Sequence, residues 1–321
     1  MYKFKALLLL CLIVVFVACG GTNDEAVIDD GFTGGDALHA DVPLLWHVTS
    51  PAGHTMYLFG SMHVADASIY PLPSFIMEAF ERSDYLAVEI NVIDPPEPAD
   101  LIALGNMMVV TGGSSIIDYI GYELHERAQA LLNYHQPEGW LPAFADSFAP
   151  VVWWMSLQEI VTTAAGLTPE YGIDMYFMNL ASERDMPIIE AESLLFQMSM
   201  LSNFSHELQL ALIENAIEAA EDLDESVYYM RAMLDAWATG DYSWILELAN
   251  YEYDGFDAEL LYEFNRGMLI NRDIDMALVA RDLMTDEKQV FFMVGLLHFL
   301  HEDSIIANLE RAGYTVVRVL E

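Results

Sequence analysis

The sequence predicts an α/β (α+β) protein in which a small central mixed sheet is surrounded by many helices. Two similar segments near opposite ends of the chain carry this prediction, residues 57–63 and 291–298. Each is an apolar, aromatic-rich run that stops at Gly-x-x-His, and each is followed by a helical pattern and a further apolar run. We interpret both as a strand, a Gly-x-x-His turn, a helix and a second strand.

Between these two units the hydrophobic pattern is mostly helical. Apolar spacing predicts helices over residues 73–82, 101–110, 122–134, 148–164 and 171–183, and almost continuously from 194 to 283, with breaks at Gly240, at Asp254-Gly255 and near Asn271. Short apolar runs predict strands over residues 85–90, 187–190 and 315–320. Strands therefore lie mainly at the two ends of the domain, and helices fill its middle.

Residues 1–18 resemble a bacterial signal peptide. Lysines precede an apolar run from Ala6 to Ala18, which is shorter than the about 20 residues that a membrane-spanning helix needs. The run ends in a pattern that resembles a lipobox and predicts a lipid on Cys19; the alternative is an ordinary cleaved signal with an incidental cysteine. Residues 19–41 then form a flexible acidic tether, and residues 42–321 a single domain. This organisation predicts a protein anchored by its lipid on the outer face of a bacterial membrane.

Composition excludes several classes of function. The chain has 2 cysteines, one inside the signal and one at the lipidation position, so the mature domain has no disulfide, cysteine nucleophile or thiolate ligand. Any metal must then be held by His, Asp or Glu. With 12 Lys and Arg against 50 Asp and Glu, the formal net charge is -38. Such a surface repels nucleic acid, which is therefore not expected as a partner.

The two Gly-x-x-His turns are the first candidates for a functional site. Gly60 and Gly295 end their strands and support a sharp turn or a close approach of the backbone. His63 and His298 then follow at the mouth of the sheet, where side chains meet a ligand. One such motif alone is most often a hydrogen-bonded strand end, but two copies in matching contexts favour two imidazoles around one point.

Two carboxylates, Glu89 and Glu190, close apolar strands in the same way. An acidic residue at the end of a buried strand is costly unless it is paired, hydrogen-bonded or bound to metal; the alternative for each is a solvated strand end. If the strands are neighbours, both carboxylates face His63 and His298. Imidazole and carboxylate ligands without cysteine suit Mn, Fe, Co or Zn. Such a divalent metal lowers the pKa of a bound water, and a carboxylate beside it acts as general base.

A series of short motifs extends from about residue 44 to the C-terminus: Leu45-Trp46, Leu58-Phe59-Gly60-Ser61-Met62-His63, Glu89, Tyr171-Gly172-Ile173-Asp174, Pro187-Ile188-Ile189-Glu190, Arg272-Asp273 and Gly295-Leu296-Leu297-His298. In their order and spacing these motifs resemble the TraB/GumN family, which is related to the Tiki metalloproteases. The resemblance implies a divalent metal held by His63, Glu89 and His298. It also implies supporting or substrate-contacting roles for Asp174 and Arg272, and for Glu190 if Glu190 is not the base.

The chain departs from the family pattern at two positions. The family usually has Arg-Asn where this chain has Arg272-Asp273, and usually has Gly where this chain has His301. The second departure creates His298-x-x-His301, which on a helix places both rings on one face. We favour His298 as the ligand because it holds the motif position, and we expect His301 to be solvated or to support the site from outside.

The leading hypothesis is an extracytoplasmic, lipid-anchored, metal-dependent hydrolase of the peptidase kind, in which Glu89 or Glu190 activates water. The alternative is a non-catalytic lipoprotein that binds or sequesters a peptide or a small signalling molecule in the same pocket. A purely structural lipoprotein gives no reason for two histidine units.

Overall fold

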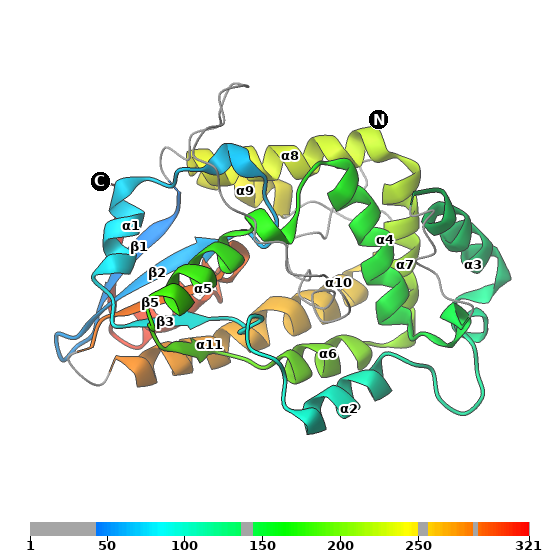
Figure 1. The fold of residues 1–321 in the computed structure, drawn as a ribbon, viewed down its shortest axis with the longest axis horizontal. Coiled ribbons are helices and arrows are strands. Elements are labelled where there is room, and N and C mark those ends of the chain that lie inside the picture. Colours follow the sequence, from blue (N-terminus) through cyan, green and yellow to red (C-terminus); the bar gives the residue numbers. More distant parts are fainter. Residues whose placement is uncertain (1–42, 136–143, 250–255, 285–287, 321) are drawn as a thin grey trace.

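The computed structural model describes residues 43–135, 144–249, 256–284 and 288–320 (Figure 1). The predicted signal peptide, Cys19 and the tether lie outside these residues, as does the predicted break at Asp254-Gly255. The strands are β1 (Leu45–Thr49), β2 (Thr55–Ser61), β3 (Tyr85–Val88), β4 (Ile188–Glu190), β5 (Val290–Gly295) and β6 (Thr315–Val319).

The helices match most of the predicted segments. They are α1 (Ser74–Glu81), α2 (Pro98–Met107), α3 (Ile116–His135), α4 (Pro150–Ala164), α5 (Ile173–Glu183), α6 (Leu194–Ser202), α7 (His206–Glu221), α8 (Leu223–Thr239), α9 (Tyr242–Ala249), α10 (Ala258–Asn265), α11 (Asn271–Leu283) and α12 (Ile305–Arg311). The mixed sheet surrounded by helices confirms the predicted α/β class.

The sheet has the strand order β4-β3-β5-β2-β1-β6. The pairs β4–β3, β3–β5 and β5–β2 are parallel, whereas β1 pairs antiparallel with both β2 and β6. The two predicted units are present as β2–α1–β3 and β5–α12–β6. β5 lies between β2 and β3, so the second unit inserts its first strand into the middle of the first unit.

Aromatic side chains fix helices on one face of the sheet. Phe59 of β2 and Phe291 of β5 are neighbouring core residues with ring centroids 5.6 Å apart. Phe177 of α5 contacts both rings, at 5.7 and 5.1 Å, and Phe80 of α1 contacts Phe291 at 5.6 Å. Trp237 of α8 contacts Phe59 at 6.2 Å. These buried rings bring α1, α5 and α8 against the two strands that precede the histidine turns.

The described residues form two adjoining hydrophobic cores. One is built on the sheet with α1, α5, α8, α11 and α12, and the other lies among α2, α3, α4, α6, α7 and α10. Figure 1 shows the sheet at one end of the molecule and the second group of helices at the other. α4 joins the two, because Val161 belongs to the first core and Ile160 to the second.

Two details of the long helical region differ from the sequence prediction. The chain is not broken near Asn271: a π-helix over Arg266–Ile270 continues α10 directly into α11. Two breaks that the pattern did not predict separate α6 from α7 and α7 from α8. At the first of them, Ser205 caps the start of α7 by accepting a hydrogen bond from the Leu208 N–H. The predicted break at Gly240 is confirmed, since Gly240 ends α8 with a φ of 64°.

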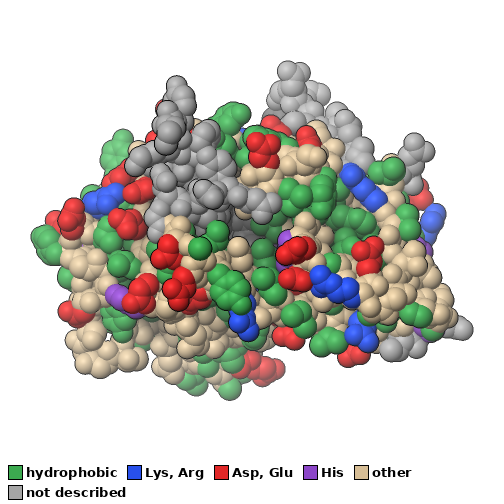
Figure 2. All heavy atoms as spheres, turned by 180° about the vertical axis from the view of Figure 1, so that it is seen from behind, with side chains coloured by type: hydrophobic (Ala, Val, Ile, Leu, Met, Phe, Trp, Pro, Cys, Tyr) green, Lys and Arg blue, Asp and Glu red, His purple; other side chains and the backbone are tan. Residues whose placement is uncertain are grey.

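The surface carries the acidic excess that the composition predicts. On the face drawn in Figure 2, Asp and Glu side chains are spread over the surface, and Lys and Arg occupy a few separate places. None of the helices in the described ranges is long and apolar enough to cross a membrane.

Gly60 offers a test of how closely the two histidine units pack. A Cβ at this position would lie 2.3 Å from Leu296 Cδ1 and 3.2 Å from Leu296 Cα. We expect Gly60→Ala to lower the free energy of unfolding by about 1–3 kcal/mol, the usual cost of overpacking, in urea titrations. Gly105→Ala is the matched control, because a Cβ there meets nothing within 4 Å and Ala favours a helix. Equal stability of Gly60→Ala and the parent would contradict the close packing.

Candidate metal centre

Parallel pairing brings the ends of three strands to one edge of the sheet. Ser61 of β2 is in register with Gly295 of β5, and Val88 of β3 is in register with Met293. The residues that follow these strands leave the sheet at their carboxyl ends, which is where ligands of parallel sheets bind. His63, Glu89 and His298 follow β2, β3 and β5 respectively, and the structure brings all three together.

The three side chains point toward one another with the atoms that could bind a metal, which are Nε2 of each imidazole and Oε2 of the carboxylate. The Nε2 atoms of His63 and His298 lie 3.9 and 3.8 Å from Oε2 of Glu89. All three side chains are almost fully buried. A Cβ on Gly295 would lie 3.2 Å from His63 Nε2 and 3.6 Å from Glu89 Oε2. The glycine therefore keeps open the small space between the donors, which any side chain would fill.

Asp174 holds the ring of His63. Its Oδ2 lies 2.8 Å from Nδ1 of His63, and its Oδ1 accepts a hydrogen bond of 2.8 Å from the Ser61 hydroxyl. Because an ionised carboxylate only accepts, Nδ1 is the donor and Nε2 of a neutral ring presents its lone pair to Glu89. Asp174 lies in the first turn of α5, which docks on the turn through the Ile173 N–H to Met62 O bond of 2.9 Å.

Gly172 makes that docking possible. A Cβ at this residue would lie 2.3 Å from the carbonyl oxygen of His63. The N-terminus of α5 can therefore approach the backbone of the first histidine turn only because residue 172 has no side chain.

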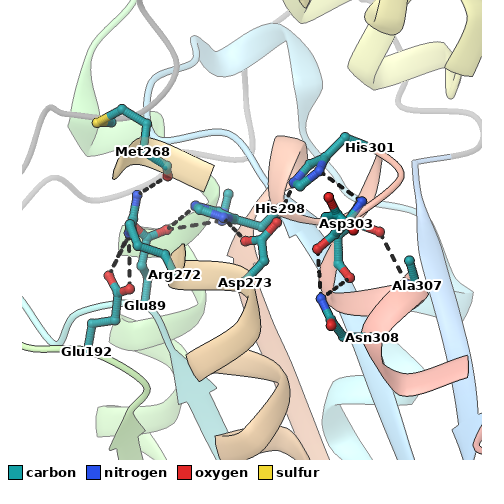
Figure 3. A network of polar contacts seen from close by, with 12 residues as sticks. Glu89, Glu192, Met268, Arg272, Asp273, His298, His301, Asp303, Ala307 and Asn308 are labelled. Atoms are coloured by element: carbon teal, nitrogen blue, oxygen red, sulfur yellow. Dashed lines mark hydrogen bonds and ion pairs between the residues drawn. The ribbon is translucent and has the colours of Figure 1, made fainter. Parts of the chain in front are cut away.

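Asp273 holds the ring of His298 in the same way. Its Oδ1 pairs with Nδ1 of His298 and its Oδ2 pairs with Nε2 of His301 (Figure 3). The side chain of Asp273 is fully buried in α11. Both motif histidines therefore present Nε2 to the same point, and each has its Nδ1 fixed by an aspartate from a different helix.

Glu89 is fixed through its other oxygen. Oε1 pairs with the Arg272 guanidinium and accepts a hydrogen bond of 2.6 Å from Gln197 Nε2. Arg272 Nε in turn donates to both oxygens of Glu192, at 3.0 and 2.9 Å. Figure 3 shows Arg272 between Glu89 and Glu192. Oε2 of Glu89 is left turned toward the two imidazoles, and it also accepts a bond of 3.3 Å from the Gly295 N–H.

The π-helix before α11 supports this arrangement. Within it the Asn271 N–H bonds to Arg266 O, one residue further back than in an α-helix. Arg272 Nη1 donates to Met268 O at 2.9 Å, a carbonyl one turn earlier. The guanidinium thus folds back along its own helix and also reaches Glu89 and Glu192.

The charges of the site shift two pKa values in opposite directions. Burial alone would lower the pKa of His63, but the neighbouring Asp174, with a further contribution from Glu89, raises it to about 9. Burial alone would raise the pKa of Glu89, but the Arg272 guanidinium, together with His298 and His63, holds it well below its usual range. These charges therefore favour the ionised form of Glu89.

The residues present fit a divalent metal ion. Within the described ranges, no group of three or more His, Cys, Asp or Glu side chains is placed so that it could hold a metal ion as it stands. The separations of 3.8 and 3.9 Å are nevertheless within the reach of two ligand bonds of about 2.0–2.2 Å each. Two imidazole nitrogens and one carboxylate oxygen around a space that a Cβ would fill are a suitable donor set.

The charge balance points the same way. Four carboxylates of the site have little or no exposure: Glu89 and Glu192 pair with the Arg272 guanidinium, and Asp174 and Asp273 pair with the imidazoles of His63 and His298. Buried charges are costly unless they are paired. When both imidazoles are neutral, a divalent cation between them would compensate much of the remaining negative charge.

The structure places the other predicted site residues differently. Glu190 is exposed, and its Oε1 accepts a bond of 2.8 Å from the Asn91 N–H. In the register of β4 and β3 it lies opposite Val88, so its side chain leaves the sheet on the face opposite to that of Glu89. Its role as a base stays a prediction. Arg272 is 1% exposed and pairs with Glu89, as expected of a supporting residue.

Sequence reasoning missed two residues of the site, Glu192 and Gln197. Glu192 lies two residues beyond the motif carboxylate Glu190, and both oxygens bind Arg272. Gln197 is a buried polar residue on an otherwise apolar turn of α6, which was the one available signal. Neither residue has a spacing that ties it to Glu89 in the sequence.

The pKa of His63 gives a prediction for the metal-free protein. The ring binds its proton more tightly in the folded chain than in the unfolded chain, where its pKa is 6.5. The resulting stabilisation is fully present below pH 6.5 and is lost as pH rises through about 9. After chelation, the free energy of unfolding in urea should therefore fall over this range more in the parent than in His63→Gln. An equal fall in both proteins would contradict the assignment.

Comparison with known proteins places the chain in a family. A model described as the TraB/PrgY/gumN family matches residues 44–318. Two curated proteins, each named "Uncharacterized protein YbaP" and found in Escherichia coli (strain K12) and Shigella flexneri, are 27% identical over 173 residues. These residues are 53% of this chain and 60% of each relative, so the chain spans about three fifths of the relatives' length. No solved structure matches. Because the family model covers almost every described residue, the chain belongs to the TraB/PrgY/gumN family.

Proposed function

We propose that this protein is a metal-dependent hydrolase of the peptidase kind. The observation that supports the proposal is the convergence of the Nε2 atoms of His63 and His298 on Oε2 of Glu89, beside Gly295, where a Cβ would lie 3.2 Å from His63 Nε2. Such a set leaves coordination positions for water and substrate, as catalytic metal sites require. The ion would be Mn, Co, Zn or Fe, since these accept imidazole and carboxylate ligands.

The chain's own residues divide the work in this proposal. His63, His298 and Glu89 hold the ion, which when bound lowers the pKa of a coordinated water and polarises a carbonyl. Asp174 and Asp273 fix the two rings, and Arg272 with Gln197 fixes Glu89. These partners keep the donor atoms in place before the ion or the substrate arrives.

Glu89 acts as a ligand and not as the base. The Arg272 guanidinium holds its pKa well below the usual range, so its carboxylate has little affinity for a proton. Glu190 stays the other base that the sequence predicts, although its side chain leaves the sheet on the face opposite to that of Glu89. Only its Oε1 is bonded in the described structure, to the Asn91 N–H, and its exposed carboxylate lies one strand away from Glu89.

A binding function is the alternative, and one observation favours it. The carboxylates nearest the donor atoms all have strong partners: Glu89 and Glu192 pair with Arg272, and Asp174 and Asp273 hold the imidazoles. A site whose carboxylates serve only to hold its ligands suits the capture of a peptide or a small signalling molecule without its conversion.

We also propose that the domain works outside the cytoplasm, attached to a membrane through a lipid on Cys19. The support is the signal-like segment of residues 1–18 and the acidic tether of residues 19–41 in the sequence. The strongly negative domain would remain soluble beside the membrane and would be held there by the lipid alone.

Cys19→Ala tests the anchor. The substitution removes the acceptor of the lipid, so labelling with a fatty-acid analogue in a bacterial host should be lost, and the protein should leave the membrane fraction or accumulate as precursor. The second cysteine, Cys11, lies inside the signal and provides the control Cys11→Ala, which should label normally. Equal labelling of Cys19→Ala and the parent would rule out lipidation at this residue.

Metal content and peptide cleavage test the enzyme. Elemental analysis of protein purified without chelator should find a divalent metal in the parent and its loss in His63→Ala, which removes one ligand. Mass spectrometry of a diverse peptide library should find new fragments with the metal-loaded parent and none with His63→Ala. Glu190→Gln should keep its metal and lose about 10²–10⁴-fold in turnover if Glu190 is the base. His206→Ala removes an exposed histidine on α7 and is the control, which should keep both the metal and the turnover.

The outcomes separate the two functions. Intact peptides throughout, with peptide retained on the metal-loaded parent, would favour the binding protein. Fragments that persist undiminished in His63→Ala would indicate a contaminating protease. Full turnover in Glu190→Gln would leave the hydrolase standing and remove Glu190 from it.

A further inference from the structure

Asp273 pairs with two imidazoles, and the second, that of His301, is not one of the three side chains proposed to bind the metal. Its Oδ1 pairs with His298 and its Oδ2 with Nε2 of His301. The side chains of Asp273 and His298 are 0% and 1% exposed, whereas that of His301 is 24% exposed. His301 is therefore the outermost member of a chain of contacts that ends at the donor atoms of the site.

Both rings come from one short segment of the chain. His298 lies in the 3₁₀ turn Leu296–Phe299, and His301 follows two residues after that turn ends. From this segment both rings reach Asp273 of α11. Figure 3 shows the two rings on either side of the Asp273 carboxylate.

His301 is itself held in one tautomer. Its Nδ1 accepts a hydrogen bond of 3.3 Å from the Asp303 N–H, so in the neutral ring the proton is on Nε2, which donates to Asp273. The segment that carries it is fixed in turn, because Asn308 Nδ2 donates to Asp303 O at 2.7 Å. The ring is thus positioned by the start of α12 before it meets Asp273.

The first histidine unit contains an equivalent arrangement. There Asp174 uses one oxygen for His63 Nδ1 and the other for the Ser61 hydroxyl. In each half of the site an aspartate orients one ring, and a second donor from the same strand–turn unit occupies its remaining oxygen. Ser61 does this in the first unit and His301 in the second.

We propose that His301 is a positioning residue of the metal centre: it holds Asp273 in the orientation that fixes the ring of His298. This role rests on the proposed metal-binding function. Without His301, Oδ2 of a fully buried carboxylate would lose its partner, and an unpaired buried acceptor is costly. The carboxylate would turn toward another donor or admit water, and His298 would lose its fixed ring orientation. Loss of such outer partners typically weakens metal binding about 10–100-fold.

The test measures metal affinity and does not depend on turnover. Zn²⁺ and Co²⁺ affinities are determined by competition with a chelating dye for the parent, His301→Leu and His301→Gln. Leu keeps much of the volume and removes the N–H donor, whereas Gln keeps an N–H that can reach Asp273. We expect His301→Leu to bind about 10–100-fold more weakly and His301→Gln to recover most of the loss. Ser61→Ala, which removes the equivalent donor beside Asp174, should weaken binding in the same way.

A double-mutant cycle separates positioning from a general structural effect. If His301 acts through Asp273, the factors by which His301→Leu and Asp273→Asn weaken metal affinity will not multiply in the double variant, because both substitutions interrupt the same chain of contacts. Circular dichroism checks folding, and His301→Ala replaces His301→Leu if the latter folds poorly, since it also removes the donor.

The outcomes distinguish failure of the metal centre from failure of the role of His301 alone. A parent that binds neither ion would overturn the metal centre and with it the role of His301. A parent that binds, together with His301→Leu of unchanged affinity, would overturn the role of His301 alone. Equal weakening in His301→Leu and His301→Gln would also overturn it, because the N–H donor would then not matter.

Discussion

The parallel pairing of β2, β5 and β3 is the constraint on which the candidate site depends. It sets the ends of these strands level at one edge of the sheet, with Ser61 beside Gly295 and Val88 beside Met293. A slip of one residue between two strands moves one chain by about 3.3 Å and reverses the face of every side chain. The donor atoms would then no longer face one another, whatever the surrounding helices contributed.

The helices supply the residues that orient the side chains of His63, Glu89 and His298. α5 brings Asp174, α6 brings Gln197, and α11 brings Arg272 and Asp273 to the same edge. Burying Glu89 and Glu192 around one guanidinium is an inefficient way to stabilise a fold, because desolvation offsets much of the attraction. The arrangement is understandable as preorganisation: each donor side chain has one conformation imposed on it by neighbours that are themselves held.

Local patterns predicted the parts of the structure that depend on local physics. Apolar runs that end in glycine or in a carboxylate predicted the strand–turn–helix units and the site residues His63, His298 and Glu89. Each such run is visible within ten residues of sequence. The environment of Glu190 depends on which way β4 pairs with β3, and Gln197 meets Glu89 across 108 residues of chain. The π-helix escaped prediction for a similar reason, since its extra residue is accommodated by the contacts of Arg272 and not by a distinct composition.

The position of β5 in the sheet has a consequence for how the protein reaches its final state. β2 and β3 are made early during synthesis and flank a gap that only β5, from the far end of the chain, can fill. Until it does, two strand edges are left without partners and open to pairing with other chains. Contacts that join distant segments also form slowly. A chain emerging from the ribosome would therefore be unable to gather the donor atoms before its last segments arrive, and assembly of the sheet and of the site would be a single late event.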